Sequence, residues 1–210
     1  MRLEEFPSNI FISGTDTGIG KTVVSAMVTL GLSATYWKPV QSGLEEETDT
    51  EFVKRVTGLP DTHFKPERYR LQEPLSPHAS AAIDGVSISL DDFQLPDTGS
   101  NNLVVEGAGG LLVPLNDDDM IIDLIEKFRL PVLLVVRSEL GTLNHTFLSL
   151  EALRNRNIPI IGVVMNGPKN ESNRKAIEKY GRVEVLGEIE PLQTLDPKTL
   201  KNEFNKIFKS

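Results

Sequence analysis

The sequence has no cysteine among its 210 residues, few aromatic side chains and a single tryptophan. Without cysteine the chain can form neither disulfide bonds nor thiolate metal sites, which suits a reducing cytoplasm. No apolar run is long enough to span a membrane, and the N-terminus lacks the basic and then apolar order of a signal peptide. The net charge of −8 leaves no excess of positive charge for nucleic acid. We therefore expect a cytoplasmic protein that binds neither nucleic acid nor membranes.

The apolar pattern predicts one α/β domain over residues 1–210. Short runs rich in Val, Ile and Leu are typical of strands covered on both faces. They lie at residues 10–13, 34–38, 103–105, 132–136, 160–165 and 183–186. Helical patterns lie between them at residues 22–32, 49–57, 120–128, 143–155, 172–180 and 197–208. This alternation predicts a mainly parallel sheet flanked by helices, with ligands at the carboxyl ends of its strands. Residues 58–77, which contain four prolines, are expected to form an irregular connection on the substrate side.

A glycine-bearing loop follows the first expected strand. It begins at Gly14 and ends in Gly20, Lys21 and Thr22, where a helix begins. In such a loop the backbone N–H groups face phosphates, the lysine adds positive charge and the hydroxyl can bind Mg²⁺. The loop is one residue longer than the common pattern G-x-x-x-x-G-K-[ST]. The alternative is a glycine-rich turn that only caps the helix.

A second candidate site residue is Lys38, which ends the expected strand at residues 34–38. The other residues of this strand are bulky or apolar, so we expect Lys38 to point into the crevice. A partly desolvated ammonium group there can stabilise developing negative charge. The alternative is a surface lysine before a proline turn, and Ser42 could simply belong to that turn.

Two acidic residues have the chemistry that Mg²⁺ prefers, which is hard oxygen ligands. Glu106 follows an apolar strand and precedes Gly-Ala-Gly-Gly. Its alternative role is a strand-end carboxylate paired with a surface lysine. Asp49 follows an acidic run at the start of a helix, and from position alone it favours a helix N-cap. The three histidines lack metal-ligand spacing and are expected to be structural.

Together these motifs resemble the dethiobiotin synthetase family. Its signature is Gly-Thr-Asp-Thr-x-Val-Gly-Lys-Thr, followed by Lys-Pro-Val-x-Ser-Gly. Further blocks agree with that family in the right order, and they are Ser76-Pro-His78, Val105-Glu106-Gly-Ala-Gly-Gly110, Gly141-Thr-Leu-Asn144-His145, Asn166-Gly167 and Gly187-Glu-Ile-Glu-Pro-Leu192. Most blocks are weak taken singly, but their common order covers almost the whole chain.

The resemblance implies a role for each matching residue. Lys21 and Lys38 would be catalytic, and the metal ligands would be Thr22, Asp49 and Glu106. The implied ATP-binding residues are Thr17, Gly18, Ile19, Gly20, Lys21, Thr22, Val23, Asp49, Glu106, Gly107, Ala108, Gly109, Asn166, Gly167, Glu190, Pro191 and Leu192. The implied substrate-binding residues are Ser42, Gly141, Thr142, Leu143 and Asn144. Glu190-Pro191 replaces a Pro-Trp pair in the adenine loop, which leaves the nucleotide preference open.

The implied reaction joins 7,8-diaminononanoate and CO₂ into a cyclic urea, dethiobiotin, at the expense of MgATP. A carbamate would form first, and its oxygen would attack the γ-phosphate of ATP to give a carbamic–phosphoric anhydride. The second amine would then attack the carbonyl carbon, expel phosphate and close the ring. Residues 141–145 begin a helix, and a helix N-terminus is a natural carboxylate site. The resemblance implies that it receives the substrate carboxylate across a homodimer interface. Glu139 would repel that carboxylate, so we expect it to face solvent.

Two other functions share the expected fold. Amide-forming relatives of the cobyrinate-synthetase type usually carry a glutamine-hydrolysing domain with a reactive cysteine, and this chain has no cysteine. Switch ATPases that position chromosomes or septa tend to have a second lysine early in the phosphate loop. This chain has Thr15 and Asp16 there, which favours the ligase.

Overall fold

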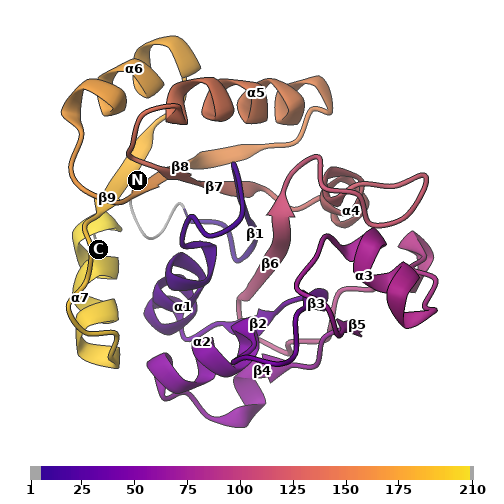
Figure 1. Cartoon of the computed structure of the whole chain (residues 1–210). Helices are drawn as coiled ribbons and strands as arrows, with labels where there is room; N and C mark the ends of the chain where they lie inside the picture. Colours follow the sequence, from indigo (N-terminus) through magenta and orange to yellow (C-terminus); the bar gives the residue numbers. More distant parts are fainter. Residues whose placement is uncertain (1–5, 209–210) are drawn as a thin grey trace.

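The computed structural model describes residues 6–208, and its main element is a parallel sheet of seven strands (Figure 1). The strands lie in the order β4-β2-β6-β1-β7-β8-β9, and every neighbouring pair is parallel. Their bounds are β1 Asn9–Gly14, β2 Thr35–Trp37, β4 Phe64–Lys65, β6 Leu103–Gly110, β7 Val132–Arg137, β8 Ile160–Asn166 and β9 Val185–Ile189. The predicted α/β class with a mainly parallel sheet is confirmed.

Helices cover both faces of this sheet, which explains why its central strands are apolar on both sides. One face packs against α1 (Lys21–Leu32), α2 (Asp49–Thr57) and α7 (Pro197–Ile207). The other face packs against α3 (Pro77–Asp84), α4 (Ile121–Phe128), α5 (Thr142–Asn155) and α6 (Glu171–Gly181). Figure 1 shows α5 and α6 together on one side and α1, α2 and α7 on the other. Among residues 6–208, no helix is long and apolar enough to cross a membrane.

The parallel register brings distant motifs to one edge of the sheet. The central strand β1 pairs with β6 on one side and β7 on the other, and β2 lies beyond β6. Since the carboxyl ends of parallel strands meet at one edge, the loop after β1, the end of β6 and the residue after β2 become neighbours. This edge holds the candidate site, as the sequence predicts.

Several boundaries differ from the sequence-based expectation. The strand expected at residues 103–105 continues to Gly110, so Glu106 lies within β6 rather than after it. The strand expected at residues 34–38 ends at Trp37, because the proline after Lys38 breaks the pairing. The chain resumes as β3 (Val40–Ser42), which pairs with β5 (Tyr69–Leu71) in a separate two-stranded sheet. The last strand lies at Val185–Ile189, later than the expected residues 183–186.

The connection expected to be irregular contains more regular structure than the sequence predicts. It holds β4, β5 and a 3₁₀ turn at Asp61–His63. The following helix α3 begins with Pro77 in its first turn, a position where the missing N–H has no intrahelical partner to lose. The helix and a second 3₁₀ turn at Leu90–Asp92 are absent from the expected elements. The strands and the 3₁₀ turns are too short to leave a clear apolar period, and the eight residues of α3 are mostly small, with Ile83 the only large apolar side chain.

Candidate active site

The loop between β1 and α1 has the backbone shape that its glycines allow. Gly18 and Gly20 have φ angles of 70° and 90°, in the left-handed region that other residues avoid. A Cβ atom at Gly20 would lie 2.1 Å from the side-chain nitrogen of Asn166. That nitrogen donates a hydrogen bond to the carbonyl oxygen of Ile19 at 2.9 Å. The close approach of Asn166 therefore requires glycine at position 20.

Lys21, the first residue of α1, lies buried at the base of this loop. Its ammonium group donates to the carbonyl oxygen of Asp16 at 2.8 Å. Burial lowers the pKa of Lys21 to about 8, against the attraction of Glu106. A nearby anion would restore the charged form. The protonation of Lys21 therefore depends on whether negative charge is bound in the loop.

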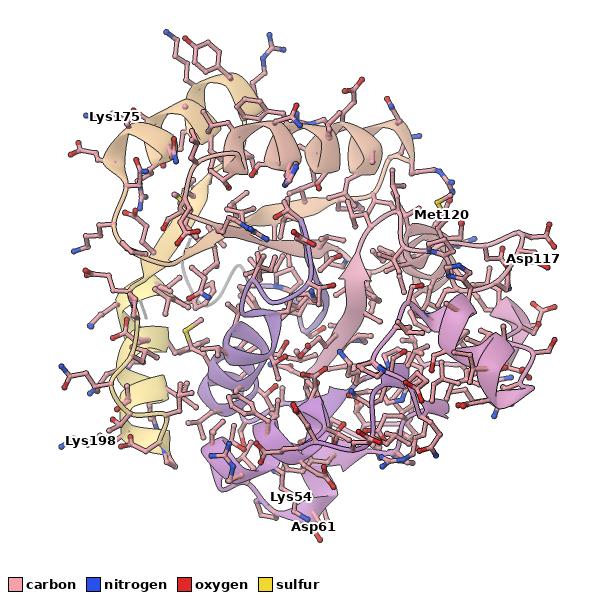
Figure 2. The ribbon with its side chains drawn as sticks, viewed as in Figure 1. Lys54, Asp61, Asp117, Met120, Lys175 and Lys198 are labelled. Carbon is pink, nitrogen blue, oxygen red and sulfur yellow. The ribbon has the colours of Figure 1, made fainter. Side chains whose placement is uncertain are left out.

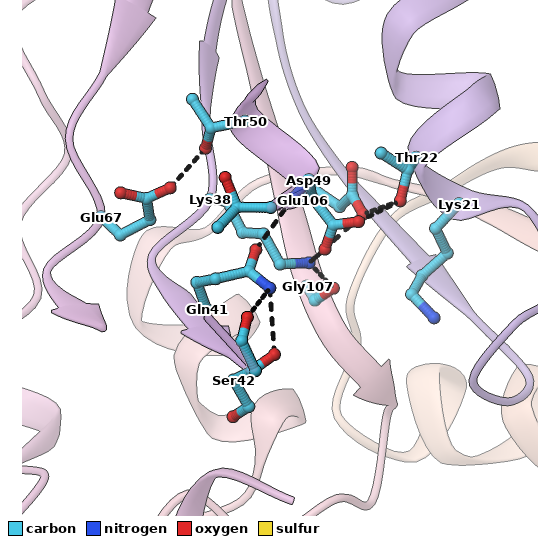
Figure 3. A network of polar contacts seen from close by, with 12 residues as sticks. Lys21, Thr22, Lys38, Gln41, Ser42, Asp49, Thr50, Glu67, Glu106 and Gly107 are labelled. Carbon is cyan, nitrogen blue, oxygen red and sulfur yellow. Dashed lines mark hydrogen bonds and ion pairs between the residues drawn. The ribbon is translucent and has the colours of Figure 1, made fainter. Parts of the chain in front are cut away.

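Four side chains from separate elements converge beside the loop (Figure 3). The hydroxyl oxygen of Thr22, on α1, lies 2.7 Å from Asp49 Oδ1 and 2.9 Å from Glu106 Oε1. The Lys38 ammonium nitrogen lies 2.6 Å from Asp49 Oδ2 and 3.3 Å from Glu106 Oε1. It also contacts the carbonyl oxygen of Gly107 at 3.4 Å. We call Thr22, Lys38, Asp49 and Glu106 the edge cluster.

The edge cluster is charged although it is largely inaccessible to water. The side chains of Lys38 and Glu106 are 5% and 1% exposed, and that of Asp49 is 30% exposed. Burial works to lower the pKa of Lys38, but Glu106 and Asp49 outweigh it, and the pKa rises above its usual value. Burial works to raise the pKa of Asp49, but Lys38 and Thr22 hold it below its usual value. Lys38 and Asp49 therefore keep each other ionised.

The structure excludes the helix-cap alternative for Asp49. The cap of α2 is Thr48, whose hydroxyl accepts from the backbone N–H of Glu51, while Glu51 accepts in return from Thr48. Asp49 is the next residue, and its side chain turns to Thr22 and Lys38 instead. The spacing Thr-x-x-Glu is a capping-box signature, so this assignment was readable in the sequence.

A buried tyrosine contacts the edge cluster through Glu106. Tyr36, on β2, is fully buried, and its hydroxyl donates to Glu106 Oε2 at 3.0 Å. Burial, followed by the charge of Glu106, raises the pKa of Tyr36 well above its usual value, so the hydroxyl stays a donor. Sequence reasoning missed this residue, because an aromatic residue in a strand gives no sign of a polar contact.

A cavity of about 300 Å³ opens beside Lys38. It is lined by Thr17, Lys38, Gln41, Ser42, Asp49, Pro74, Leu75, Ser76, Pro77, Ala108, Gly109 and Val113. The Ser42 hydroxyl is buried and has no hydrogen-bond partner within the described part of the chain. Gln41 joins the cavity wall to α2, because its side-chain oxygen accepts from the backbone N–H of Asp49 at 3.2 Å. The segment at residues 74–77 lies on this cavity, in line with the substrate-side connection expected from the sequence, whereas sequence reasoning missed Gln41.

The expected adenine loop lies on the same edge, at the ends of β8 and β9. The N–H of Gly167 donates to the carbonyl oxygen of Ile189 at 2.9 Å, which joins the two strand ends. Since Asn166 uses its amide nitrogen on Ile19, its amide oxygen is left as an acceptor. Glu190 is exposed and pairs with Lys169 at 3.3 Å. Pro191 is exposed, and Leu192 packs partly against the core.

The start of α5 differs from the other predicted site segments, because it does not line the cavity beside Lys38. All residues that line that cavity precede residue 114. Thr142 is 1% exposed, and its hydroxyl donates to the carbonyl oxygen of Arg137 at 2.6 Å. Its side chain therefore holds the helix start in place. Leu143 and Asn144 point more to the surface, and Glu139 is exposed, as expected.

A second hollow, of about 360 Å³, joins the phosphate loop to α5. It is lined by Thr15, Asp16, Thr17, Gly110, Leu111, Leu112, Val113, His145, Leu148, Ser149 and Ala152. Two of the leucines that line it are strongly exposed, with Leu112 at 60% and Leu148 at 57%, and Leu140, just before α5, is 101% exposed. Asp16 of the loop pairs with Arg137 at 2.7 Å, which fastens the loop to the end of β7.

Two of the three histidines bond to nearby groups within the described residues, and the third, His145, lines the second hollow. His63 bonds the carbonyl oxygen of Ala34 at 2.9 Å, and His78 bonds the hydroxyl of Ser76 at 3.1 Å. Within residues 6–208, no group of three or more His, Cys, Asp or Glu side chains is placed to hold a metal ion. The candidate metal ligands of the edge cluster are two carboxylates and one hydroxyl.

Comparisons with known proteins agree with this geometry. Residues 8–199 match a family described as "AAA domain". The chain is 50% identical over 201 residues to the ATP-dependent dethiobiotin synthetase BioD of Brucella ovis, a match that covers 96% of this chain and 94% of that protein. The protein of the same name from Brucella abortus matches with the same identity and coverage.

Solved structures resemble the fold at much lower identity. A ParA family ATPase from Chlorobium tepidum has a TM-score of 0.52 at 11% identity, covering 93% of this chain and 96% of that one. The septum site-determining protein MinD of Pyrococcus horikoshii, complexed with Mg-ADP, has a TM-score of 0.53 at 12% identity, covering 96% of each chain. At these identities the likeness concerns the fold alone.

The sheet order and the phosphate loop, with its buried lysine, define a P-loop nucleotide-binding protein of the AAA-domain kind. Within that class, this chain belongs to the ATP-dependent dethiobiotin synthetase family, since half of its residues are identical to those relatives over nearly its full length. The resemblance inferred from the sequence is confirmed. The switch ATPases share the fold, as expected.

The edge cluster makes a prediction about stability. Lys38→Met leaves two carboxylates without their cation, so it should lower the free energy of unfolding by about 3–5 kcal/mol. Lys54→Met is the matched control, because Lys54 pairs with Asp61 at the surface (Figure 2), where the side chains are 49% and 83% exposed. The control should change stability by less than about 0.5 kcal/mol. Equal urea midpoints for the two variants would contradict the buried-cluster interpretation.

Proposed function

We propose that this chain is an ATP-dependent dethiobiotin synthetase that acts in biotin biosynthesis. Its substrates would be 7,8-diaminononanoate, CO₂ or bicarbonate, and ATP. The observation that carries the proposal is the buried Lys38 ammonium, held between Asp49 and Glu106 where the phosphate loop meets the cavity. The identity to named synthetases supports the substrate class. We further propose that the chain works in the cytoplasm, which suits a cysteine-free sequence, and that the seven-stranded sheet is the core of one domain over residues 1–210.

Mg²⁺ fits the edge cluster because the Thr22 hydroxyl makes more close oxygen–oxygen contacts than it has hydrogens to donate. The Thr22 hydroxyl has one proton, yet its oxygen lies 2.7 Å and 2.9 Å from two carboxylate oxygens. One of these contacts therefore has no hydrogen, and a cation between the oxygens would stabilise both. Thr22, Asp49 and Glu106 are the hard oxygen ligands that Mg²⁺ takes beside nucleotide phosphates. A bound ion would neutralise charge on the β- and γ-phosphates.

ATP would lie along the carboxyl edge of the sheet. The loop from Thr17 to Val23 would hold the phosphates through its N–H groups, the α1 N-terminus and Lys21. Residues 107–109 continue β6 beside Lys38, where their backbone would approach the nucleotide. The Asn166 amide oxygen would accept from an exocyclic amine of the base, with Gly167 and residues 190–192 beside it. The Lys169–Glu190 pair takes the place of an aromatic platform.

The diamine would occupy the cavity beside Lys38. Leu75 and Val113 supply apolar wall for the alkyl chain, and Ser42 supplies an unpartnered hydroxyl. We infer that Ser42 donates to the carbamate once CO₂ has joined the first amine. A buried polar group without a partner costs about 1–3 kcal/mol, which a ligand oxygen would recover.

The chemistry requires little covalent help from the protein. The carbamate oxygen attacks the γ-phosphorus and ADP leaves; the second amine then attacks the carbamoyl carbon, a C–N bond forms, and phosphate and a proton leave. Lys38 lies between the cavity and the phosphate loop, where its charge can stabilise both the carbamate and the transferring phosphoryl group. Lys21 supplies the second charge from the loop. The site's main contribution is to align these groups.

A homodimer would complete the site. The start of α5 offers N–H groups and a partial positive charge, but it lies away from the cavity of its own chain. The exposed Leu112 and Leu148 of the second hollow, and the exposed Leu140 just before α5, are the apolar residues that an interface would bury. We propose that residues 141–144 of one protomer bind the carboxylate of the diamine held by its partner.

The direct test of the proposed function is an assay with the diamine, labelled bicarbonate and MgATP. The expected product is acid-stable and labelled, and it forms together with ADP and phosphate. ATP hydrolysis at the same rate with and without the diamine would overturn the assignment.

The pKa of Lys21 predicts how ATP binding depends on pH. Phosphate binds the charged form, and this pKa is about 8 without nucleotide. Affinity for a non-hydrolysable ATP analogue in EDTA should therefore fall as pH rises above about 8, by up to tenfold per pH unit. Lys21→Arg should give a flat profile, because arginine stays charged. Calorimetric titration of both proteins checks this, and equally flat profiles would contradict it.

The homodimer prediction is tested by mixing two inactive variants. Thr22→Val removes the metal-binding hydroxyl, and Asn144→Glu repels the substrate carboxylate while still favouring the helix N-terminus. After subunit exchange, each heterodimer has one site with both intact halves. Random mixing should restore about a quarter of wild-type activity. Two affinity tags allow the heterodimers to be isolated. If the isolated heterodimers are inactive, each chain builds its own substrate site.

A further inference from the structure

Tyr36 is a buried polar residue that the reaction itself does not use. It lies in the middle of β2, with its ring fully buried and tilted against Phe64 at a centroid distance of 6.3 Å. The partner of its hydroxyl is Glu106 Oε2, at 3.0 Å. A phenylalanine would fill the same space in an apolar core. The hydroxyl therefore calls for a reason other than packing.

The register of the sheet explains why Tyr36 reaches Glu106. Tyr36 pairs with Val104 on the parallel strand β6, and Glu106 lies two residues further along β6. Since side chains alternate between faces, Val104 and Glu106 share one face of the sheet. The side chain of Tyr36 packs with Val104 in the core on that face, and its hydroxyl lies beneath the carboxylate.

The two oxygens of Glu106 have different partners. Oε1 faces Thr22 and Lys38, at 2.9 Å and 3.3 Å, on the side of the proposed Mg²⁺ site. Oε2 faces away from that site and accepts from Tyr36. The last torsion of a glutamate is soft, because rotation about an sp³–sp² bond has broad minima. Without a donor on Oε2, the carboxylate would be free to turn.

We propose that Tyr36 is a positioning residue for the metal site: its hydroxyl fixes the rotation of the Glu106 carboxylate so that Oε1 faces the ion. The inference rests on the proposed role of Glu106 as a Mg²⁺ ligand. Partners that orient a metal ligand from behind typically change metal affinity by 10–100-fold when they are removed. Because Tyr36 does not line the cavity and its hydroxyl bonds to Glu106, its loss should act through Glu106.

The test compares Tyr36→Phe with wild type by calorimetric titration of ADP, in EDTA and in Mg²⁺. The ratio of the two dissociation constants gives the gain in ADP affinity due to the metal. In Tyr36→Phe the dissociation constant in EDTA should stay within about twofold, while the gain due to Mg²⁺ should fall about tenfold. The substrate KM for the diamine should not change. Urea unfolding verifies that the variant is folded under the binding conditions.

Tyr69→Phe is the matched control, since it removes another buried tyrosine hydroxyl from a short strand. Tyr69 lies on β5 and its hydroxyl donates to Asp92, remote from the edge cluster. This variant should lose stability but keep the full gain in ADP affinity from Mg²⁺. An undiminished gain in folded Tyr36→Phe would overturn the positioning role and leave the metal site intact. A wild-type protein without any gain would overturn the metal site itself, and the positioning role with it.

Discussion

The site depends on one buried ammonium group. Lys38 lies directly after β2, where it contacts Asp49 and Glu106 in a region that water barely reaches. A lone ammonium would be too costly there, and so would either carboxylate. Because α1, α2 and β6 each contribute one member and Lys38 directly follows β2, the cluster joins the two helices to the sheet edge. A buried charge must be paired with an opposite charge, and this requirement also makes the edge cluster suited to binding phosphate and a cation.

The cations of the site offset the repulsion between ATP and the negatively charged chain. A protein with a net charge of −8 repels ATP at long range, so binding must come from short-range cations and dipoles. Lys21, the helix N-terminus of α1 and the proposed Mg²⁺ supply them at one end of the cavity. Burial lowers the pKa of Lys21, and a phosphate bound beside it would favour the charged form. The negative charge of the phosphates would be neutralised by the metal ion and by the two lysines.

The sequence predicts the parallel sheet and places Thr22, Lys38 and Glu106 at its carboxyl edge, because apolar runs of strand length and a phosphate loop are strong patterns. Asp49 joins them only through the family resemblance, since its position alone favours a helix cap. The sequence does not predict β3, β4 and β5, whose two or three residues leave no apolar period, nor α3, whose residues are mostly small. The role of Thr48 as helix cap was readable from Thr-x-x-Glu, whereas the contact between Tyr36 and Glu106 was not. That contact depends on the register between β2 and β6, a tertiary property that the residue type does not encode. The separation of residues 141–144 from the cavity is tertiary in the same way.

The central claim is that the edge cluster is a preformed metal and phosphate site. A crystal structure with MgADP and the diamine tests it most directly. The account predicts an Mg²⁺ ion bound by the Thr22 hydroxyl and by Asp49 and Glu106, directly or through water, with Lys38 still in the cavity wall. Nucleotide bound on the phosphate loop with its metal remote from Glu106, or with Lys38 turned to solvent, would contradict the account.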